Sequence, residues 1–306
     1  MAGAAAIFPG QGAQEVGMGR DVADACAVAA DTFRQADEIL GFALSKLCFD
    51  GPPQRLNATD IQQPAIFTTS VALFRAALER GLFRREDFSA LGGLSLGEYT
   101  ALHLAGSLPF DATLRLVYRR GQLMQQAAER APGGMVSLLG LHWDQVLALC
   151  ERVAERGRLG PANFNCPGQI VVSGDKAACD AVVGLAESAG GKAVALDVAG
   201  AFHSELMRPA AEGLRAALAA ADFQPPRVRV VANVDAEYHR EAAGIRESLY
   251  RQVFNPVRWQ ACLQRLIADG CGPFWEVGPK RVLTGLLRKI DRGAKTTSLS
   301  KLADFG

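Results

Sequence analysis

The stretch Gly92-Gly93-Leu94-Ser95-Leu96-Gly97-Glu98 places a serine between two glycines, after a short apolar run and before a helix-forming run. This is the pattern of a nucleophile elbow, a tight strand-to-helix turn in which side chains larger than glycine would collide with the neighbouring strand and helix. The N–H of Leu96 and the start of the helix would offer partial positive charge to a developing oxyanion. Acyl transfer through an acyl-serine is therefore the leading hypothesis, and the alternative is an ordinary loop, which can also carry this pattern.

The composition indicates a folded protein with no overall charge bias. The chain has 306 residues, of which 49% are hydrophobic, and 33 basic residues against 32 acidic ones leave a formal net charge of +1. Such a chain can bury a large core, and nothing in its global charge favours nucleic acid or a membrane. The start lacks a basic segment followed by a long apolar one, and no run of about 18 apolar residues occurs. We therefore expect a cytoplasmic protein.

The cysteines do not suggest a metal site or a disulfide framework. They are odd in number, scattered, and without paired metal-ligand spacing. We expect buried, reduced thiols and no metal. They are Cys26, Cys48, Cys150, Cys166, Cys179, Cys262 and Cys271.

Apolar runs and helical patterns alternate through the first part of the chain, which indicates a parallel sheet with helices on its faces. We expect a strand at 4–8, helices at 22–40 and 65–80, and a strand at 90–93 that leads into the elbow. A further helix should run from Asp111, as a possible cap, through Ala128. After residue 200, the pattern predicts strands at 228–232 and 274–277, followed by a helix at 279–287 that opens on Pro279.

Between these parts lies a segment with a different pattern. It predicts, in order, a strand at 135–141, a helix at 144–156, strands at 161–165 and 169–173, a helix at 176–189 and a strand at 192–198. This β-α-β-β-α-β order is that of a ferredoxin-like unit. We predict an α/β body made of residues 1–130 and 200–306, a small inserted domain at 131–199, and a cleft between the two as the site.

A reactive serine needs a base, and histidine is the usual one. His103 lies eight residues beyond Ser95 on the same predicted helix, about 12 Å along its axis, and so cannot reach the hydroxyl. His142 precedes a predicted helix, and His239 lies in what reads as a solvated charged turn. His203 follows a strand end, where α/β folds present chemistry, although it could also simply pack beside Phe202.

No acidic third member of a triad is evident. Asp197 lies on a predicted strand shortly before Gly200 and could as easily be a surface or capping carboxylate. A carbonyl oxygen could orient the imidazole instead.

An arginine interrupts the apolar stripe of the helix after Asp111. At 100° per residue, Arg120 falls among Leu116, Leu123 and Met124, whereas Arg119 points to the polar side. A buried arginine needs an anion. That anion is either an internal Asp or Glu, or a bound carboxylate gripped through two parallel hydrogen bonds, which would select an acyl group with a free acid end.

Several motifs together resemble those of the malonyl-CoA:acyl carrier protein transacylases, the standalone acyltransferases of fatty acid synthesis or of trans-acting polyketide type. They span nearly the whole chain in family order. They are 8–14 (Phe-Pro-Gly-Gln-Gly-Ala-Gln), 62–65 (Gln-Gln-Pro-Ala), 95–99 (Ser-Leu-Gly-Glu-Tyr), 120–121 (Arg-Gly), 163–169 (Asn-Phe-Asn-Cys-Pro-Gly-Gln), 202–204 (Phe-His-Ser), 255–257 (Asn-Pro-Val) and 276–279 (Glu-Val-Gly-Pro).

The resemblance implies an α/β-hydrolase-like large domain with a parallel sheet and an inserted ferredoxin-like small domain. It implies that Ser95 is the nucleophile and His203 the base, oriented by the carbonyl oxygen of Gln252. Backbone N–H groups of Gln11 and Leu96 would form the oxyanion hole.

For the substrate, the resemblance implies that Arg120 binds the malonyl carboxylate and that Gln63 lines the acyl pocket, with Phe202 beside it. The implied reaction is a ping-pong transfer from malonyl-CoA to the phosphopantetheine thiol of an acyl carrier protein. It needs no cofactor of its own and no metal. We expect a monomer that binds its carrier transiently and binds neither nucleic acid nor membrane.

One position departs from the family pattern. The family usually has histidine before the serine, whereas this chain has Leu94. The departure favours a polyketide-serving enzyme and puts in doubt any polar contribution of that position to acyl binding, but the serine–histidine chemistry does not depend on it.

Two other functions fit parts of the pattern. A hydrolase that strips stalled acyl groups from carrier proteins would use the same Ser95 and His203, but it would gain little from a fixed arginine clamp. A noncatalytic carrier-docking module would not need an intact serine and histidine. Basic residues that could face an acidic carrier, or be plain solvated charges, are Arg208, Lys280, Arg281 and Lys289.

Overall fold

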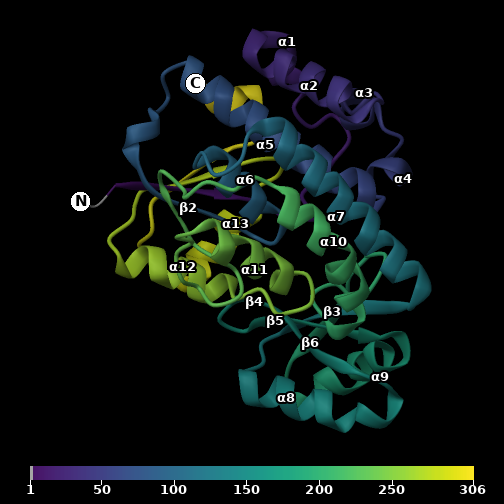
Figure 1. Cartoon of the computed structure of the whole chain (residues 1–306). Helices are drawn as coiled ribbons and strands as arrows, with labels where there is room; N and C mark the ends of the chain where they lie inside the picture. Colours follow the sequence, from purple (N-terminus) through teal and green to yellow (C-terminus); the bar gives the residue numbers. More distant parts are fainter. Residues whose placement is uncertain (1–2) are drawn as a thin grey trace.

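The computed structural model describes residues 3–306, and its centre is a five-stranded parallel sheet with the order β7-β2-β1-β8-β9 (Figure 1). Each of the four strand pairs in this sheet is parallel, as predicted for an α/β fold. The strands are β1 (Ala4–Phe8), β2 (Phe88–Gly93), β7 (Arg229–Val230), β8 (Phe274–Val277) and β9 (Thr296–Leu299).

Strand β1 is buried on both faces, which explains why it reads as a continuous apolar run. Ala6 and Phe8 pack into one core and Ile7 into the other, because successive strand residues point to opposite faces. Helices α12 and α13 cover the Ile7 face, and α5 and α6 cover the other (Figure 1). Both ends of the chain thus contribute to one α/β body.

The helices of this body carry most of the core, and α5 is buried along nearly its whole length. The helices are α1 (Arg20–Ala25), α2 (Ala27–Leu40), α3 (Leu44–Asp50), α4 (Pro53–Leu56), α5 (Thr59–Glu79), α6 (Leu96–Leu104), α7 (Phe110–Arg130), α10 (Arg208–Ala220), α11 (Ala242–Gln252), α12 (Trp259–Ala268) and α13 (Leu283–Ile290). Short 3-10 helices lie at Arg85–Asp87, Ala154–Arg156, Glu187–Ala189, Glu205–Met207 and Leu302–Phe305.

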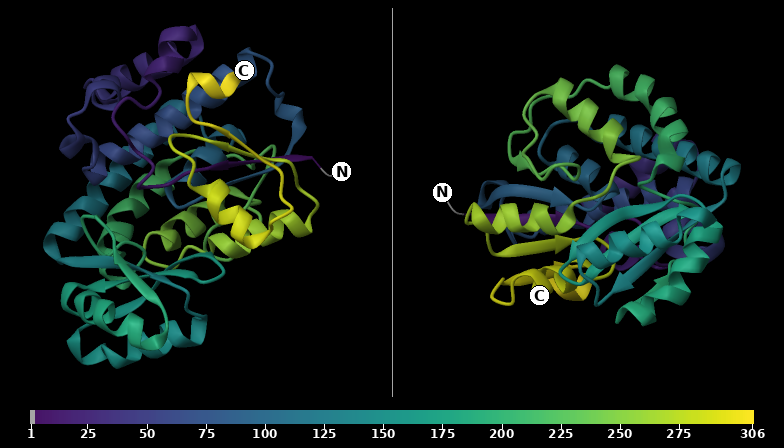
Figure 2. Two further views of the ribbon diagram at one scale, coloured as in Figure 1. Left: turned by 180° about the vertical axis from the view of Figure 1, so that it is seen from behind. Right: turned by 90° about the horizontal axis from the view of Figure 1, so that it is seen from below.

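A second, antiparallel sheet with the order β4-β5-β3-β6 lies at one end of the molecule (Figures 1 and 2). Its chain order and strand order are those of a ferredoxin-like unit, as predicted. The elements are β3 (Gly133–Leu139), α8 (Trp143–Arg152), β4 (Leu159–Cys166), β5 (Gln169–Asp175), α9 (Lys176–Ala186) and β6 (Lys192–Ala195). It has a hydrophobic core of its own.

Strand β4 joins this unit to the large body. The N–H of Phe164 donates to the carbonyl oxygen of Val257 at 2.9 Å, and the N–H of Val257 donates to the carbonyl oxygen of Ala162 at 2.8 Å. The second sheet lies within the segment predicted as the insertion, 131–199. The division of the chain into two folding domains at those boundaries remains a prediction.

Several predicted helix boundaries were wrong. The helix predicted at 22–40 is two helices separated at Cys26, whose backbone is extended with φ −136°. Asp111 does not cap α7, which begins at Phe110 after Pro109. Helix α5 begins six residues before the predicted start and runs straight through Pro64.

The helix predicted at 279–287 begins only at Leu283. Gly278 has φ 151° and Lys280 has φ 60°, so the backbone around Pro279 cannot be helical. Strand β9 was not predicted, because its sequence, Thr-Thr-Ser-Leu, has little apolar character. Among residues 3–306, no helix combines the length and apolar character needed to cross a bilayer.

Candidate active site

Ser95 stands at the turn between β2 and α6 with positive φ (53°, ψ −101°), a conformation that is costly for a residue other than glycine. A Cβ on Gly93 would lie 1.9 Å from the carbonyl carbon of Gly97, and a Cβ on Gly97 would lie 2.1 Å from the carbonyl oxygen of Phe8. Only glycine fits at either position. The backbone therefore has the strand–turn–helix geometry that the pattern predicts.

His203 meets Ser95 from the loop after β6. Its Nε2 lies 2.8 Å from Ser95 Oγ, and its Nδ1 lies 2.7 Å from the carbonyl oxygen of Gln252 at the end of α11. A carbonyl oxygen only accepts, so Nδ1 carries the proton and Nε2 is free to accept from the serine hydroxyl. Asp197 is exposed and takes no part.

The imidazole is neutral at neutral pH. Burial lowers the pKa of His203 to about 4, and the positive charge of Arg120 acts in the same direction. A neutral imidazole with Nε2 free can accept a proton from Ser95, which is what a general base must do.

Arg120 reaches the nucleophile from α7 and is almost fully buried, at 2% exposure. Its Nη2 donates to Ser95 Oγ at 3.0 Å and to Gln252 Oε1 at 3.0 Å, and its Nη1 donates to Gln63 Oε1 at 2.6 Å. Its Nε–H has no acceptor among residues 3–306. All the hydrogen-bond acceptors of the Arg120 side chain are thus neutral oxygens. The sequence left two candidates for its anion, an internal Asp or Glu and a bound carboxylate, and no Asp or Glu within residues 3–306 accepts a hydrogen bond from it.

Behind the serine lies a group of buried polar residues that the sequence analysis missed. Asn233 Oδ1 accepts from the N–H of Ser95 at 2.6 Å, and Asn233 Nδ2 donates to the carbonyl oxygen of Gly93 at 2.8 Å. Glu98, on the first turn of α6, contacts His239 Nε2 at 2.7 Å and Gln252 Nε2 at 2.7 Å. The sequence does contain a sign that Glu98 is buried and paired: it is a charged residue followed on the same helix by the mostly apolar run Tyr-Thr-Ala-Leu.

The interpretation of His239 as part of a solvated turn was wrong. Its side chain is 2% exposed, although Glu237 and Arg240 on either side are exposed. His103 is structural, as predicted: its Nδ1 lies 2.9 Å from the carbonyl oxygen of Leu108. His142 precedes α8 as its N-cap residue, also as predicted.

A cavity of about 180 Å³ opens beside Ser95 and His203, between the large body and the second sheet. Phe202 and Gln11 line it, whereas Gln63 and Arg120 are not among its lining residues. The rest of the lining comes from the large body and from the segment that carries the second sheet. These residues are Leu94, Met124, Met135, Asn163, Asn165, Gln169, Val171, Leu196, Val198, Val282 and Leu286. The cavity lies where a cleft was predicted, and its role as the site stays a prediction.

The predicted oxyanion-hole residues lie at this cavity. Gln11 lines it, and Leu96 is the first residue of α6, directly after Ser95. Neither backbone N–H donates to a protein acceptor within residues 3–306. Both donors are therefore free for an oxyanion, although their role stays a prediction.

The predicted basic residues each have a partner within the protein. Arg208 pairs with Glu205 and Arg281 with Asp304, while Lys280 Nζ donates to the carbonyl oxygen of Gly12 at 3.1 Å. Lys289 Nζ lies 3.5 Å from Gln169 Oε1. Their role toward a carrier protein stays a prediction. All seven cysteines are buried free thiols, as predicted, and no cluster of three or more His, Cys, Asp or Glu in residues 3–306 is suited to a metal ion.

Comparison with known proteins assigns the family. The profile of the acyl transferase domain family matches residues 6–302. The chain belongs to this family. This acyl transferase is 42% identical over 296 residues to the malonyl CoA-acyl carrier protein transacylase of Bacillus subtilis (strain 168), covering 96% of this chain and 92% of that one. It is 40% identical over 285 residues to the Escherichia coli (strain K12) protein of the same name, covering 93% and 91%.

Solved structures agree with the sequence comparison. The acyl-carrier-protein S-malonyltransferase of Burkholderia pseudomallei 1710b superposes with a TM-score of 0.94 at 39% identity, covering 100% of this chain and 98% of that one. A malonyl-transacylase solved in complex with a type II PKS acyl-carrier protein has a TM-score of 0.94 at 38% identity, covering 99% and 98%. The predicted resemblance to this family and the predicted fold class are confirmed.

Proposed function

We propose that this acyl transferase moves a malonyl group from malonyl-CoA to the phosphopantetheine thiol of an acyl carrier protein, through an ester on Ser95. One observation carries the choice of acyl group: the buried Arg120 guanidinium lies 3.0 Å from the nucleophile, and the oxygens to which it donates are all neutral. The malonyl carboxylate is two bonds from the carbonyl carbon that Ser95 would attack, so a cation at this distance can reach it. The names of the relatives support the same acyl group and acceptor.

In the first half-reaction, Ser95 Oγ attacks the thioester carbonyl carbon while His203 Nε2 takes its proton. The oxygen that gains negative charge is placed to accept from the N–H groups of Gln11 and Leu96. The carbonyl oxygen of Gln252, at 2.7 Å from Nδ1, stabilises the imidazolium that forms. When the carbon–sulfur bond breaks, His203 returns the proton to the CoA sulfur, leaving malonyl-Ser95.

The second half-reaction runs the same chemistry in reverse on a new thiol. His203 takes the proton of the phosphopantetheine thiol, the sulfur attacks the ester carbonyl, and Ser95 Oγ leaves and regains its proton. A thioester is exchanged for a thioester, so no large driving force is needed and water is the competitor to exclude. This is ping-pong kinetics.

The proposed exchange uses no metal and no redox cofactor, since the phosphopantetheine belongs to the carrier. We propose that the enzyme works as a monomer in the cytoplasm, on a carrier protein of fatty acid or polyketide assembly. No contact with nucleic acid or membrane is part of this proposal.

Intact-mass measurement after separate exposure to malonyl-, methylmalonyl- and acetyl-CoA tests this function directly. We expect a malonyl adduct on Ser95, release of one CoA per chain in a burst, and loss of the adduct to an added carrier protein. Free malonate released faster than malonyl-carrier forms would instead show a hydrolase. The absence of any adduct and of any burst would leave only a docking function.

The pH dependence of acylation should report the low pKa of His203. Protonation removes the base, so activity is present above this pKa and is lost as the pH falls through it. With a pKa of about 4, we expect the rate of Ser95 acylation to stay level from about pH 8 to about pH 5 and to fall only near pH 4. The rate of adduct formation after brief pH jumps measures it. A fall in the acylation rate centred near pH 6.5, the ordinary pKa of histidine, would contradict the low pKa of His203.

A further inference from the structure

A buried carboxylate lies one layer behind the catalytic pair, outside the cavity. Glu98 is 0% exposed. Its Oε1 accepts from His239 Nε2 at 2.7 Å, and its Oε2 accepts from Gln252 Nε2 at 2.7 Å and from the backbone N–H of Asn233 at 3.1 Å. Burial of a carboxylate is costly unless it is paired and hydrogen-bonded, and these three donors meet that requirement.

The side-chain amide of Gln252 connects this carboxylate to Arg120. Its Oε1 accepts from Arg120 Nη2 at 3.0 Å, and its Nε2 donates to Glu98 and to the carbonyl oxygen of Ser95 at 2.9 Å. A guanidinium only donates and a carboxylate only accepts, so the amide between them has a single possible orientation. Arg120 and Glu98 are thus opposite charges separated by one amide.

The separation matters for binding of an acidic acyl group. A carboxylate in direct contact would occupy the Arg120 N–H groups and compete with the substrate. At one amide's distance, Glu98 offsets the buried positive charge while Arg120 Nη1 and Nη2 remain on neutral oxygens. A carboxylate carries a full negative charge and can accept two parallel hydrogen bonds from a guanidinium, whereas the present acceptors are neutral oxygens, so a substrate carboxylate can displace them.

The same carboxylate fixes both members of the catalytic pair through its partners. Asn233 binds the backbone of the elbow at Ser95, and Gln252 holds His203 through its carbonyl oxygen. The positive φ of Ser95 persists only if surrounding contacts hold it in place. We infer that Glu98 is a positioning residue for acyl transfer, which holds Asn233 and Gln252 in register and offsets the charge of Arg120; this inference rests on the proposed function.

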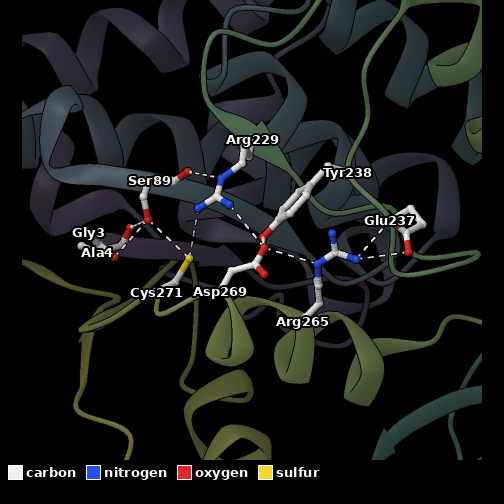
Figure 3. A network of polar contacts seen from close by, with 9 residues as sticks. All are labelled: Gly3, Ala4, Ser89, Arg229, Glu237, Tyr238, Arg265, Asp269 and Cys271. Atoms are coloured by element: carbon white, nitrogen blue, oxygen red, sulfur yellow. Dashed lines mark hydrogen bonds and ion pairs between the residues drawn. The ribbon is translucent and has the colours of Figure 1, made fainter. Parts of the chain in front are cut away.

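The segment that carries Asn233 and His239 is also held from outside. Tyr238 Oη donates to Asp269 Oδ2 at 2.6 Å, and the Tyr238 ring lies between the guanidinium groups of Arg229 and Arg265, at 4.9 and 5.0 Å from its centre (Figure 3). The adjacent His239 is buried against Glu98. Contacts on both faces of this segment therefore fix the donors that Glu98 needs.

Glu98→Gln tests the inference with little change in volume. The new amide brings a donor against the N–H groups of Gln252 or Asn233, or else against His239 Nε2, which must then change tautomer to accept, and it removes the negative charge. We expect acylation of Ser95 to slow about tenfold or more with both malonyl-CoA and acetyl-CoA, with no rise in KM for malonyl-CoA. Rates come from intact-mass time courses, and kcat and KM from transfer to a carrier protein.

Glu276→Gln is the matched control. Glu276 is equally buried, at 1% exposure, and accepts from three backbone N–H groups at the start of α13, at 2.8, 2.8 and 2.7 Å, but does not contact Gln252 or Asn233. We expect it to lower the melting temperature about as much as Glu98→Gln while acylation stays within about twofold of wild type. Equal losses of activity in the two variants would reduce Glu98 to a structural role and overturn the inference.

Two His239 variants decide the matter if Glu98→Gln does not fold. His239→Gln keeps a donor toward Glu98 and should retain acylation within about threefold, whereas His239→Leu removes the donor and should slow it further. Wild-type rates in both would overturn the inference, as would a Glu98→Gln loss confined to malonyl-CoA through KM. If wild type takes acetyl but no malonyl group, the proposed function fails, and the Glu98 comparison is still read with acetyl-CoA.

Discussion

Replacement of Ser95 by alanine should reduce malonyl transfer by about 10⁴-fold or more, as in other serine enzymes whose catalytic unit is broken. The alanine has no oxygen to attack the thioester, and His203 Nε2 loses the partner that lies 2.8 Å away. The backbone of the elbow should survive, because its contacts with Asn233 involve the main chain. Intact mass after exposure to malonyl-CoA should show no adduct.

Ser89→Ala is the matched control for this variant. Ser89 lies on β2, the strand that leads into the elbow, and its hydroxyl donates to the carbonyl oxygen of Gly3 at 3.1 Å, away from the cavity. It should acylate as wild type does. Retained labelling of Ser95→Ala would contradict the assignment of the nucleophile.

Replacement of Arg120 by alanine should reduce kcat/KM for malonyl groups by about 10²- to 10⁴-fold. The loss of two charge-assisted hydrogen bonds, each worth roughly 1.5 to 3 kcal/mol, gives this range at about 1.4 kcal/mol for each factor of ten. Acetyl groups have no carboxylate and should lose far less. Parallel kinetics with malonyl-CoA and acetyl-CoA measure the selectivity.

Arg119→Ala is the matched control. Arg119 is next to Arg120 on α7, but its side chain is exposed to solvent. It should leave both activities unchanged. Removal of Arg120 also leaves Gln63 Oε1 and Gln252 Oε1 without their donor, so some stability will be lost. An equal loss of malonyl and acetyl transfer would mean that Arg120 acts only as a structural residue.

Local sequence patterns correctly predicted those helices, strands and turns whose conformation depends mainly on their own residues. The apolar run of β1 and the two glycines around Ser95 gave the central strand and the elbow, because burial on both faces and steric exclusion are local demands. Elements without a local signal were missed or misplaced. Strand β9 is polar and forms only because β8 offers an unpaired edge.

The helix predicted at 279–287, with Pro279 in its first turn, shows the same limit. Proline at a first helical turn is a common pattern, but here the carboxylate of Glu276 binds the N–H groups of Val282 and Leu283 and sets the start of α13. That contact depends on the position of β8 relative to the helix. A contact of this kind, between a strand side chain and the start of the next helix, cannot be predicted from the local sequence pattern.

The chain itself determined the chemistry that each residue can perform: a serine on a glycine-flanked turn, a histidine after a strand end, and an arginine on an apolar helix face. Only the tertiary structure decided their partners. Ser95 and His203 are 108 positions apart, and Ser95 and Gln252 are 157 apart. Buried polar groups take their acceptors from whichever elements pack against them, so His239, which reads as a surface residue, became the partner of Glu98.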